Sequence, residues 1–322
     1  MEYRRLGASG LSVSAIGIGT NAFGSRADRD ASLGVLRRAL ELGVNLIDTA
    51  DIYGAGRSEE IIGEGLAGRR DEAVLATKAG FPTGDGPNGR GGSRLHLLGA
   101  VEDSLRRLRT DHIDLFQIHL FDPWTPREET LRTLEDLVRQ GKVRYIGTSN
   151  YAAWQLALAL GESRLHGLER FQSVQVSYSL ADRTAEMEMQ PLCVAEGVGL
   201  LPYYPLAGGI LTGKYGQGTP KGSRAERTPR FKERITPERL ALARRVEEIA
   251  QTAGAAPAAL SIAWLMRRPA VASVVAGATS AAQLEANLEA LEVPWDEQIE
   301  AALESCSAPF KAGQPFETYR LT

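Results

Sequence analysis

The stretch Asn45-Leu46-Ile47-Asp48-Thr49-Ala50-Asp51-Ile52-Tyr53-Gly54 shows the pattern from which the fold is predicted. A short apolar run ends in polar residues and a glycine, which is typical of a buried parallel strand that leads into a loop. Eight runs of this kind occur along the chain: Ala15–Gly19, Asn45–Ala50, Ala73–Lys78, Ile113–His119, Val143–Asn150, Ser173–Ser179, Gly199–Tyr204 and Val271–Gly277. The chain is therefore expected to contain eight buried strands.

Amphipathic segments lie between these runs and predict helices: Asp28–Leu42, Arg57–Leu66, Arg94–Leu108, Pro126–Gln140, Ala152–Leu160, Glu186–Glu196 and Ser280–Leu291. Alternating strands and helices predict an α/β protein with a parallel sheet and right-handed connections. An open doubly wound sheet would alternate in the same way. Eight units without a break in composition favour closure into one (β/α)8 TIM barrel domain over residues 1–322.

Two other segments stand apart from the alternation. Tyr3–Ser14 contains two short β-like pieces separated by Gly7-Ala8-Ser9-Gly10, which predicts an N-terminal β-hairpin that closes the barrel floor. Leu206–Thr236 is the longest irregular stretch and is rich in Gly, Lys and Arg. A loop of this length inside a compact domain is usually functional.

The composition limits the classes of partner and compartment. Hydrophobic residues make up 43% of the chain and the net charge is only −3, so neither nucleic acid nor an anionic membrane is expected as a partner. No apolar run reaches the roughly 18 residues of a membrane span, and the N-terminus lacks the pattern of a signal peptide. Two cysteines, Cys193 and Cys306, make neither a disulfide framework nor a zinc motif. We expect a cytoplasmic protein without a metal, and the sequence leaves its oligomeric state open.

Four polar residues follow three consecutive predicted strands. Asp48 and Tyr53 follow the second strand, Lys78 ends the third and His119 ends the fourth. Each residue alone has a simpler explanation, as a helix cap, a packing aromatic, a solvent-facing amine or a satisfied core histidine. Because the carboxyl ends of barrel strands share one rim, the four together predict an active site.

The four side chains suit the reduction of a carbonyl group. The developing alkoxide needs a proton donor, and Tyr53 can serve if its pKa falls from about 10. The Lys78 ammonium is expected to lower that pKa, and Asp48 is expected to keep Lys78 charged and in place. His119 is expected to donate a hydrogen bond to the carbonyl oxygen.

These residues and several further motifs resemble the aldo-keto reductase family over nearly the whole chain, in the branch of many bacterial members and potassium-channel β subunits. The motifs are Asp48–Gly54, Ala76–Lys78, Gln117–His119, Gly141–Asn150, Tyr203–Leu206 and Leu211–Tyr215. In that family Asp48, Tyr53, Lys78 and His119 would form the catalytic tetrad. The resemblance therefore implies NADPH-dependent reduction of a small-molecule aldehyde or ketone, with Tyr53 as the proton donor.

The family binds NADPH (NADP+) across the barrel mouth without a Rossmann fold, and the resemblance assigns residues to each part of the cofactor. Ser149, Asn150 and Gln175 would bind the carboxamide, and Tyr203 would stack on the nicotinamide. The pyrophosphate loop would comprise Pro205, Leu206, Gly208, Leu211 and Lys214, followed by Ser223 and Arg224. Gly277, Thr279, Gln283 and Asn287 would hold the adenosine and its 2′-phosphate at a helix N-terminus. Gly19, Thr20, Asn21 and Asp48 complete the expected contacts.

The adenosine segment departs from one branch of the family. Gly277 and Gln283 stand where that branch carries a lysine and an arginine, and Ala286 stands where an acidic adenine contact is common. The segment is closer to the branch with Gly-Ala-Ser/Thr and Gln at these positions, and we expect NADPH in preference to NADH.

Three alternative functions remain open from the sequence. The scaffold can serve as a regulatory or binding module with slow turnover, as in channel β subunits. Lys78 can be read as the Schiff-base amine of a barrel lyase, and His119 as the ligand of a metal hydrolase.

Phe23, Phe81, Phe121 and Trp124 follow strand ends and are expected to line an apolar substrate pocket.

Overall fold

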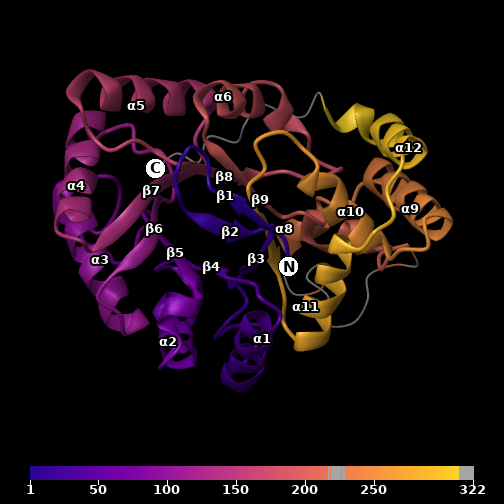
Figure 1. Cartoon of the computed structure of the whole chain (residues 1–322), viewed down its shortest axis with the longest axis horizontal. Coiled ribbons are helices and arrows are strands. Elements are labelled where there is room, and N and C mark those ends of the chain that lie inside the picture. The colour runs from indigo at the N-terminus through magenta and orange to yellow at the C-terminus, as the bar shows by residue number, and fades with distance from the viewer. Residues whose placement is uncertain (217, 219–225, 227–228, 312–322) are drawn as a thin grey trace.

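Eight parallel strands form the central barrel of the computed structural model, which describes residues 1–216, 218, 226 and 229–311 (Figure 1). The strands are β3 (Ile16–Gly19), β4 (Leu46–Asp48), β5 (Val74–Ala79), β6 (Ile113–Ile118), β7 (Val143–Ser149), β8 (Ser173–Ser177), β9 (Gly199–Tyr203) and β10 (Val274–Gly277). They pair in chain order from β3 to β9, and β10 pairs with β3. Backbone hydrogen bonds from Leu200 N to Ala270 O and from Ala272 N to Leu200 O close the ring between β9 and the segment before β10. The predicted TIM barrel and all eight strands are confirmed.

Helices cover the outside of the barrel (Figure 1). The helices with predicted counterparts are α1 (Arg29–Glu41), α2 (Arg57–Gly65), α3 (Arg94–Leu108), α4 (Arg127–Arg139), α5 (Ala153–His166), α6 (Met189–Glu196) and α11 (Ala281–Leu288). Of these, α3 packs on β5, α4 on β7 and α6 on β9. Four further helices were not predicted: α8 (Pro229–Lys232), α9 (Pro237–Thr252), α10 (Pro257–Met266) and α12 (Glu297–Ser307). Helix α10 is apolar on nearly every face because it is buried, so it lacks the amphipathic period that marks a surface helix.

The barrel floor is closed by the predicted hairpin of β1 (Tyr3–Arg5) and β2 (Ser12–Ser14). Leu6 and Val13 are fully buried against barrel residues such as Leu46 and Leu201, so the lower half of the interior is apolar. Gly7 holds the turn with φ of 58°, and a Cβ there would lie 2.5 Å from the carbonyl oxygen of Gln172. Only glycine lets the hairpin approach the floor this closely.

Within the described residues, no single helix is long and apolar enough to cross a membrane. Helices α9 and α10 reach that length and composition only as a pair, and their axes bend by 91° at the junction.

Candidate active site

A buried ion pair lies at the carboxyl end of the barrel. Lys78 Nζ is 2.7 Å from Asp48 Oδ2 and donates a second hydrogen bond of 2.7 Å to the carbonyl oxygen of Thr49. The Lys78 and Asp48 side chains are 0% and 3% exposed. The other carboxylate oxygen accepts hydrogen bonds from Gln117 Nε2 at 3.2 Å and Gln175 Nε2 at 2.8 Å. These bonds provide the pairing and hydrogen bonding that a buried charge needs to remain ionised.

The strand register explains why these residues meet. Lys78 on β5 lies opposite Gln117 on β6, and Ser149 on β7 lies opposite Gln175 on β8. Asp48 is the last residue of β4. Polar side chains from five adjacent strands are thus directed to one end of the barrel, as the sequence predicted for the shared rim.

Tyr53 and His119 join this pair from the loops that follow β4 and β6. Tyr53 begins a tight turn, Tyr53–Gly56, in which Gly54 and Ala55 adopt φ of 59° and 56°. Lys78 Nζ lies 5.2 Å from the centroid of the Tyr53 ring. The His119 ring stands edge-on to Tyr53 with their centroids 6.0 Å apart. The four predicted catalytic side chains therefore converge.

The electrostatics differ from the sequence expectation for Tyr53. Burial raises the pKa of Tyr53 above its usual value, and this effect outweighs the opposing influence of the Lys78 ammonium. The expected lowering of the Tyr53 pKa was wrong for the resting site because a phenolate loses its hydration here. For Lys78, burial acts to lower the pKa, but the negative charge of Asp48 and the interactions with Tyr53 more than offset it and the pKa is raised. Burial, helped by the Lys78 charge, holds the pKa of His119 well below its usual value. At neutral pH the site thus holds a phenol, an ammonium and a neutral imidazole.

A polar group beside the tetrad contains the residues expected to bind the carboxamide. Asn150, with φ of 58°, accepts a hydrogen bond from the Tyr203 hydroxyl at 2.7 Å and donates one to the carbonyl oxygen of His119 at 3.0 Å. Ser149 Oγ donates to the Gln175 carbonyl oxygen at 3.1 Å. Hydrogen bonds thus connect this group to His119 and, through the Gln175 side chain, to Asp48.

The loop after β9 carries Pro205, Leu206, Gly208, Leu211 and Lys214, and the charge of Lys214 is disfavoured there. Burial lowers the pKa of Lys214, and the charge of Arg26 lowers it further. Gly208 and Gly209 adopt φ of 70° and 99°, and a Cβ on Gly209 would lie 2.6 Å from Lys214 Nζ. Leu211 is fully buried and anchors the loop. A bound anion would stabilise the charged form of Lys214.

The strand and helix ends expected to hold the adenosine also lie together. Gly277 pairs with Gly19 in the β10–β3 register, and a Cβ on Gly277 would lie 4.0 Å from Asn21 Oδ1. Thr20 is buried and its hydroxyl donates to the Asp48 carbonyl oxygen at 2.9 Å. Closure of the barrel between β10 and β3 therefore brings these predicted segments next to each other.

The start of α11 has its own hydrogen-bonded cap. Gln283 Oε1 accepts from the Thr279 backbone N–H at 2.9 Å, and the Ser280 hydroxyl accepts from Gln283 N at 3.2 Å. Asn287 is buried and donates to the Gly277 carbonyl oxygen at 3.3 Å. Gln283 and Asn287 thus shape this end of the helix. Ser223 and Arg224, also expected at the cofactor, lie outside the described residues.

Several residues of the site were not predicted. Gln117 was quoted as part of a motif but not as a partner of Asp48, and Arg26 was not singled out. Behind the tetrad, buried Glu59 accepts hydrogen bonds from the Thr77 hydroxyl at 2.6 Å and from Arg107 at 2.7 Å. Polar residues inside otherwise apolar buried strands, Thr77 on β5 and Gln117 on β6, are the signal that could have revealed the contacts of Glu59 and Asp48.

Asp51 is the other unpredicted buried acid near the tetrad. Its side chain is buried, and no side chain donates a hydrogen bond to either carboxylate oxygen. Burial and the negative charge of Glu59 raise its pKa to about 7, against the opposing effects of Arg107 and Lys78. Asp51 therefore changes charge within the physiological pH range.

The four aromatic residues expected to line a pocket lie in different surroundings. Phe81 stands edge-on to His119 with ring centroids 4.6 Å apart, so it borders the site. Phe23 is fully buried in the main core, so its assignment to the pocket was wrong. Phe121 packs on Trp154 with ring centroids 5.9 Å apart, and Trp124 is 64% exposed.

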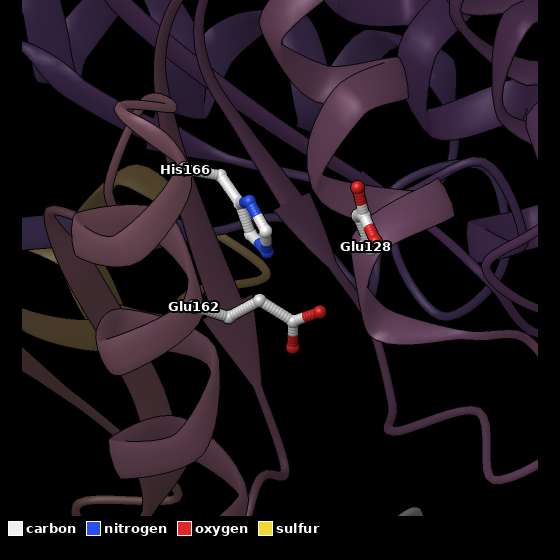
Figure 2. A group of neighbouring side chains, drawn as sticks. All are labelled: Glu128, Glu162 and His166. Carbon is white, nitrogen blue, oxygen red and sulfur yellow. The ribbon is translucent and has the colours of Figure 1, made fainter.

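Figure 2 shows a group with metal-ligand spacing on the outer helices, made of Glu128 from α4 and Glu162 and His166 from α5. Both carboxylates already bind arginines. Glu128 lies 2.7 Å from Arg132, and Glu162 lies 3.0 Å from Arg127. The group is accounted for as part of a surface ion-pair network.

Comparisons with known proteins agree with this geometry. The model of the aldo/keto reductase family matches residues 15–308. The oxidoreductase YrpG of Bacillus subtilis is 37% identical over 310 residues, which cover 93% of this chain and 94% of that protein. The L-glyceraldehyde 3-phosphate reductase of Escherichia coli is 36% identical, with 90% and 88% covered. A probable voltage-gated potassium channel subunit beta of Arabidopsis thaliana is also 36% identical, with 91% and 92% covered.

Proposed function

The chain belongs to the aldo/keto reductase family, and we propose that it reduces aldehydes or ketones to alcohols with NADPH, using Tyr53 as the proton donor. Its family and its reductase-named relatives support the coarser statement that it is an oxidoreductase acting on carbonyl groups. The observation that carries the finer proposal is the buried Asp48–Lys78 pair beside the phenol of Tyr53 and the neutral imidazole of His119.

Tyr53 has the protonation state that a proton donor needs. Its raised pKa keeps the phenol protonated at neutral pH before the reaction. When the proton leaves toward the substrate oxygen, the Lys78 ammonium is in place to stabilise the phenolate. Asp48 keeps Lys78 protonated throughout, so the positive charge is available at the moment negative charge develops. The favourable interaction is therefore realised mainly in the transition state, as catalysis requires.

His119 is suited to orient the substrate rather than to transfer the proton. Because its pKa is held well below the usual value, it is neutral and keeps one ring N–H as a hydrogen-bond donor. Phe81 packs edge-on against its ring and limits its rotation. A fixed donor beside Tyr53 would align the carbonyl oxygen with the phenol.

NADPH, when bound, would supply the hydride to the carbonyl carbon. Two features of the chain fit this cofactor. Ser149, Asn150 and Gln175 offer both donors and acceptors for an amide next to the tetrad. Lys214, on the loop after β9, lies within the electrostatic influence of Arg26 and offers a cation for a phosphate group.

The lyase and hydrolase alternatives fit the site less well. A Schiff-base lysine must lose its proton to act as a nucleophile, whereas Lys78 is buried, bound to Asp48 and has a raised pKa. A hydrolytic metal needs several clustered ligands, and His119 belongs to no such cluster among the described residues.

The cofactor part of the proposal is tested by fluorescence titration with NADPH and with NADH. We expect tighter binding of NADPH, and Lys214→Met should weaken it by about tenfold or more because a charged hydrogen bond to phosphate is lost. Lys142→Met is the matched control, since Lys142 pairs with Glu102 next to the amino end of β7. Equal weakening by both variants, or no binding of either nucleotide, would contradict the assignment.

A further inference from the structure

The turn that carries Tyr53 needs support from the structure around it. This turn, Tyr53–Gly56, leads directly into α2, and Gly56 at the N-cap has no side chain with which to cap the helix. Ala55 holds a left-handed φ of 56°, which is unfavourable for a residue with a Cβ and persists only where the surroundings impose it. Contacts from neighbouring elements must therefore hold Tyr53 in one position.

Glu59 is the centre of a buried network that makes such contacts. It lies in the first turn of α2, and its side chain is 0% exposed. Its Oε1 accepts a hydrogen bond of 2.6 Å from the Thr77 hydroxyl, and its Oε2 accepts one of 2.7 Å from Arg107 Nε. Because Thr77 lies on β5 and Arg107 lies on α3, Glu59 joins α2 to both elements.

Arg107 lies against the Tyr53 turn as well as binding Glu59. A Cβ placed on Gly56 would be 2.9 Å from Arg107 Cδ and 3.1 Å from its Nε. Glycine at this position, with φ of 90°, leaves the room that the arginine side chain occupies. The ion pair with Glu59 therefore fixes the arginine side chain in contact with the end of the turn.

Thr77 connects the network to the tetrad. It precedes Lys78 on β5, and successive residues of a strand point to opposite faces of the sheet. Lys78 points into the barrel to pair with Asp48, whereas Thr77 points outward to Glu59. Glu59 thus links the strand that carries the ammonium to the helix that follows the phenol.

The position of the phenol relative to the ammonium is what this network can control. Lys78 Nζ lies 5.2 Å from the centroid of the Tyr53 ring, and its stabilisation of a phenolate weakens as the charges move apart. We propose that Glu59 and Arg107 are positioning residues, which hold the Tyr53 turn against β5 and so keep the phenol beside the Lys78 ammonium. This inference rests on the proposed role of Tyr53 as the proton donor.

Asp51 makes the network sensitive to pH. Its backbone N–H donates to the Lys78 carbonyl oxygen at 3.1 Å, and its side chain is buried two residues before Tyr53. The charged groups that face it are Glu59 from α2, Arg107 from α3 and Lys78 from β5. An ionised Asp51 would repel Glu59 and compete for Arg107, so the pair should hold Tyr53 best while Asp51 is protonated.

Steady-state kinetics distinguishes positioning from general structural support. Glu59→Gln keeps the side-chain shape and an acceptor for Thr77 but removes the charge that binds Arg107. We expect kcat to fall by roughly 10–100-fold, as misplacement by about an ångström does, while KM and the Kd for NADPH stay within about twofold. Glu64→Gln is the matched control, because Glu64 also lies on α2 and binds another helix, through Arg29 on α1. Unchanged kcat in folded Glu59→Gln, or an equal loss in Glu64→Gln, would overturn the proposal.

The pH dependence of kcat is a second readout, which loss of packing alone would not change. Because burial and the charge of Glu59 raise the pKa of Asp51 to about 7, wild-type kcat should decline severalfold as pH rises through this value. Asp51→Asn cannot ionise, so its kcat should stay level over the same range. A decline that remains in Asp51→Asn would overturn the part assigned to Asp51.

NMR of the Tyr53 ring tests the positioning without any turnover. In protein labelled with ¹³C at tyrosine Cζ, the Tyr53 signal is identified by its absence in Tyr53→Phe. This signal should move in Glu59→Gln, because the phenol shifts relative to the Lys78 charge, and should stay in place in Glu64→Gln. If wild type lacks reductase activity but the signal still moves, the proposed function fails and the positioning stands. An identical Tyr53 signal in wild type and Glu59→Gln would overturn the positioning, whatever the activity.

Discussion

The two ends of the barrel are built from the same strands but filled in opposite ways. At the amino end, Leu6 and Val13 of the hairpin plug an interior lined by Leu46 and Leu201, with no charge among them. At the carboxyl end, the same strands bury Lys78 and Asp48 as an ion pair. Burial of apolar groups stabilises a protein directly, whereas buried charges are retained at a cost. We therefore attribute stability to the apolar floor at the amino end of the barrel, and the proposed chemistry to the charged rim at the carboxyl end.

The largest expected effect is on activity at the carboxyl end. Tyr53→Phe removes the proton donor but keeps the ring, so kcat should fall by about 10²–10⁴-fold. Thermal stability and the Kd for NADPH should stay close to wild type because the hydroxyl is not needed for packing. Steady-state kinetics with a panel of small aldehydes, including glyceraldehyde, measures the loss. Near-normal kcat would remove Tyr53 from its proposed role.

Breaking the buried ion pair should affect both activity and stability. Lys78→Met leaves the Asp48 charge buried without its cation, and the free energy of unfolding should fall by about 3–5 kcal/mol. The double variant Asp48→Asn/Lys78→Met should recover much of that stability but none of the activity. Denaturant unfolding of both variants gives the comparison. A double variant as unstable as the single one would mean that packing, not charge, explains the cost.

The floor should show the opposite behaviour. Leu6→Ala empties a fully buried position beneath the barrel and should lower the free energy of unfolding by about 3 kcal/mol. Below its melting temperature, kcat should remain within about twofold of wild type, since a cavity at the floor leaves the rim intact. A large loss of kcat in the folded variant would show that the two ends are not independent.

Asp51 gives the smallest effect and the sharpest dependence on pH. Its folded-state pKa of about 7 exceeds the usual 3.8, so the folded chain holds this proton more tightly than the unfolded chain does. The stability that comes from Asp51 is thus present at low pH and is lost as pH rises toward and through 7. Asp51→Asn should be more stable than wild type at pH 8, and the difference should shrink toward pH 4. Melting temperatures across this range measure it, and a difference that does not change with pH would be evidence against burial of an ionised Asp51.

The fold was predictable from local patterns to a large extent. Eight apolar runs gave the barrel because parallel strands buried on both sides leave a distinct signature. Helix α10 was missed because burial on all sides removes its periodicity, and α5 was predicted to end at Leu160 although it continues to His166. Helix α5 buries Leu156 and Leu160 but also exposes Leu158 and Leu165. A helix that is apolar on two faces carries little amphipathic signal, so its end was difficult to predict.

The candidate site was predictable as a set of residues but not as a network of interactions. Strand-end positions placed Asp48, Lys78 and His119 on one rim. The direction of the Tyr53 pKa shift depends on whether burial or the Lys78 charge has the larger effect. The sequence shows that Lys78 is present but not how deeply Tyr53 is buried, so it could not give this direction. The contacts of Asp48 with Gln117 and Gln175 depend on strand register around the barrel, which spans residues far apart in the sequence.

The most direct test of the central claim follows the hydride that NADPH is proposed to supply to the carbonyl carbon. The purified protein would be incubated with an aldehyde and NADPH deuterated at C4, in the stereoisomer that transfers its label, and the alcohol analysed by mass spectrometry. Our account predicts one deuterium on the former carbonyl carbon with wild type and almost no product with Tyr53→Phe. An alcohol without deuterium from either C4 stereoisomer, or equal product formation by Tyr53→Phe, would contradict it.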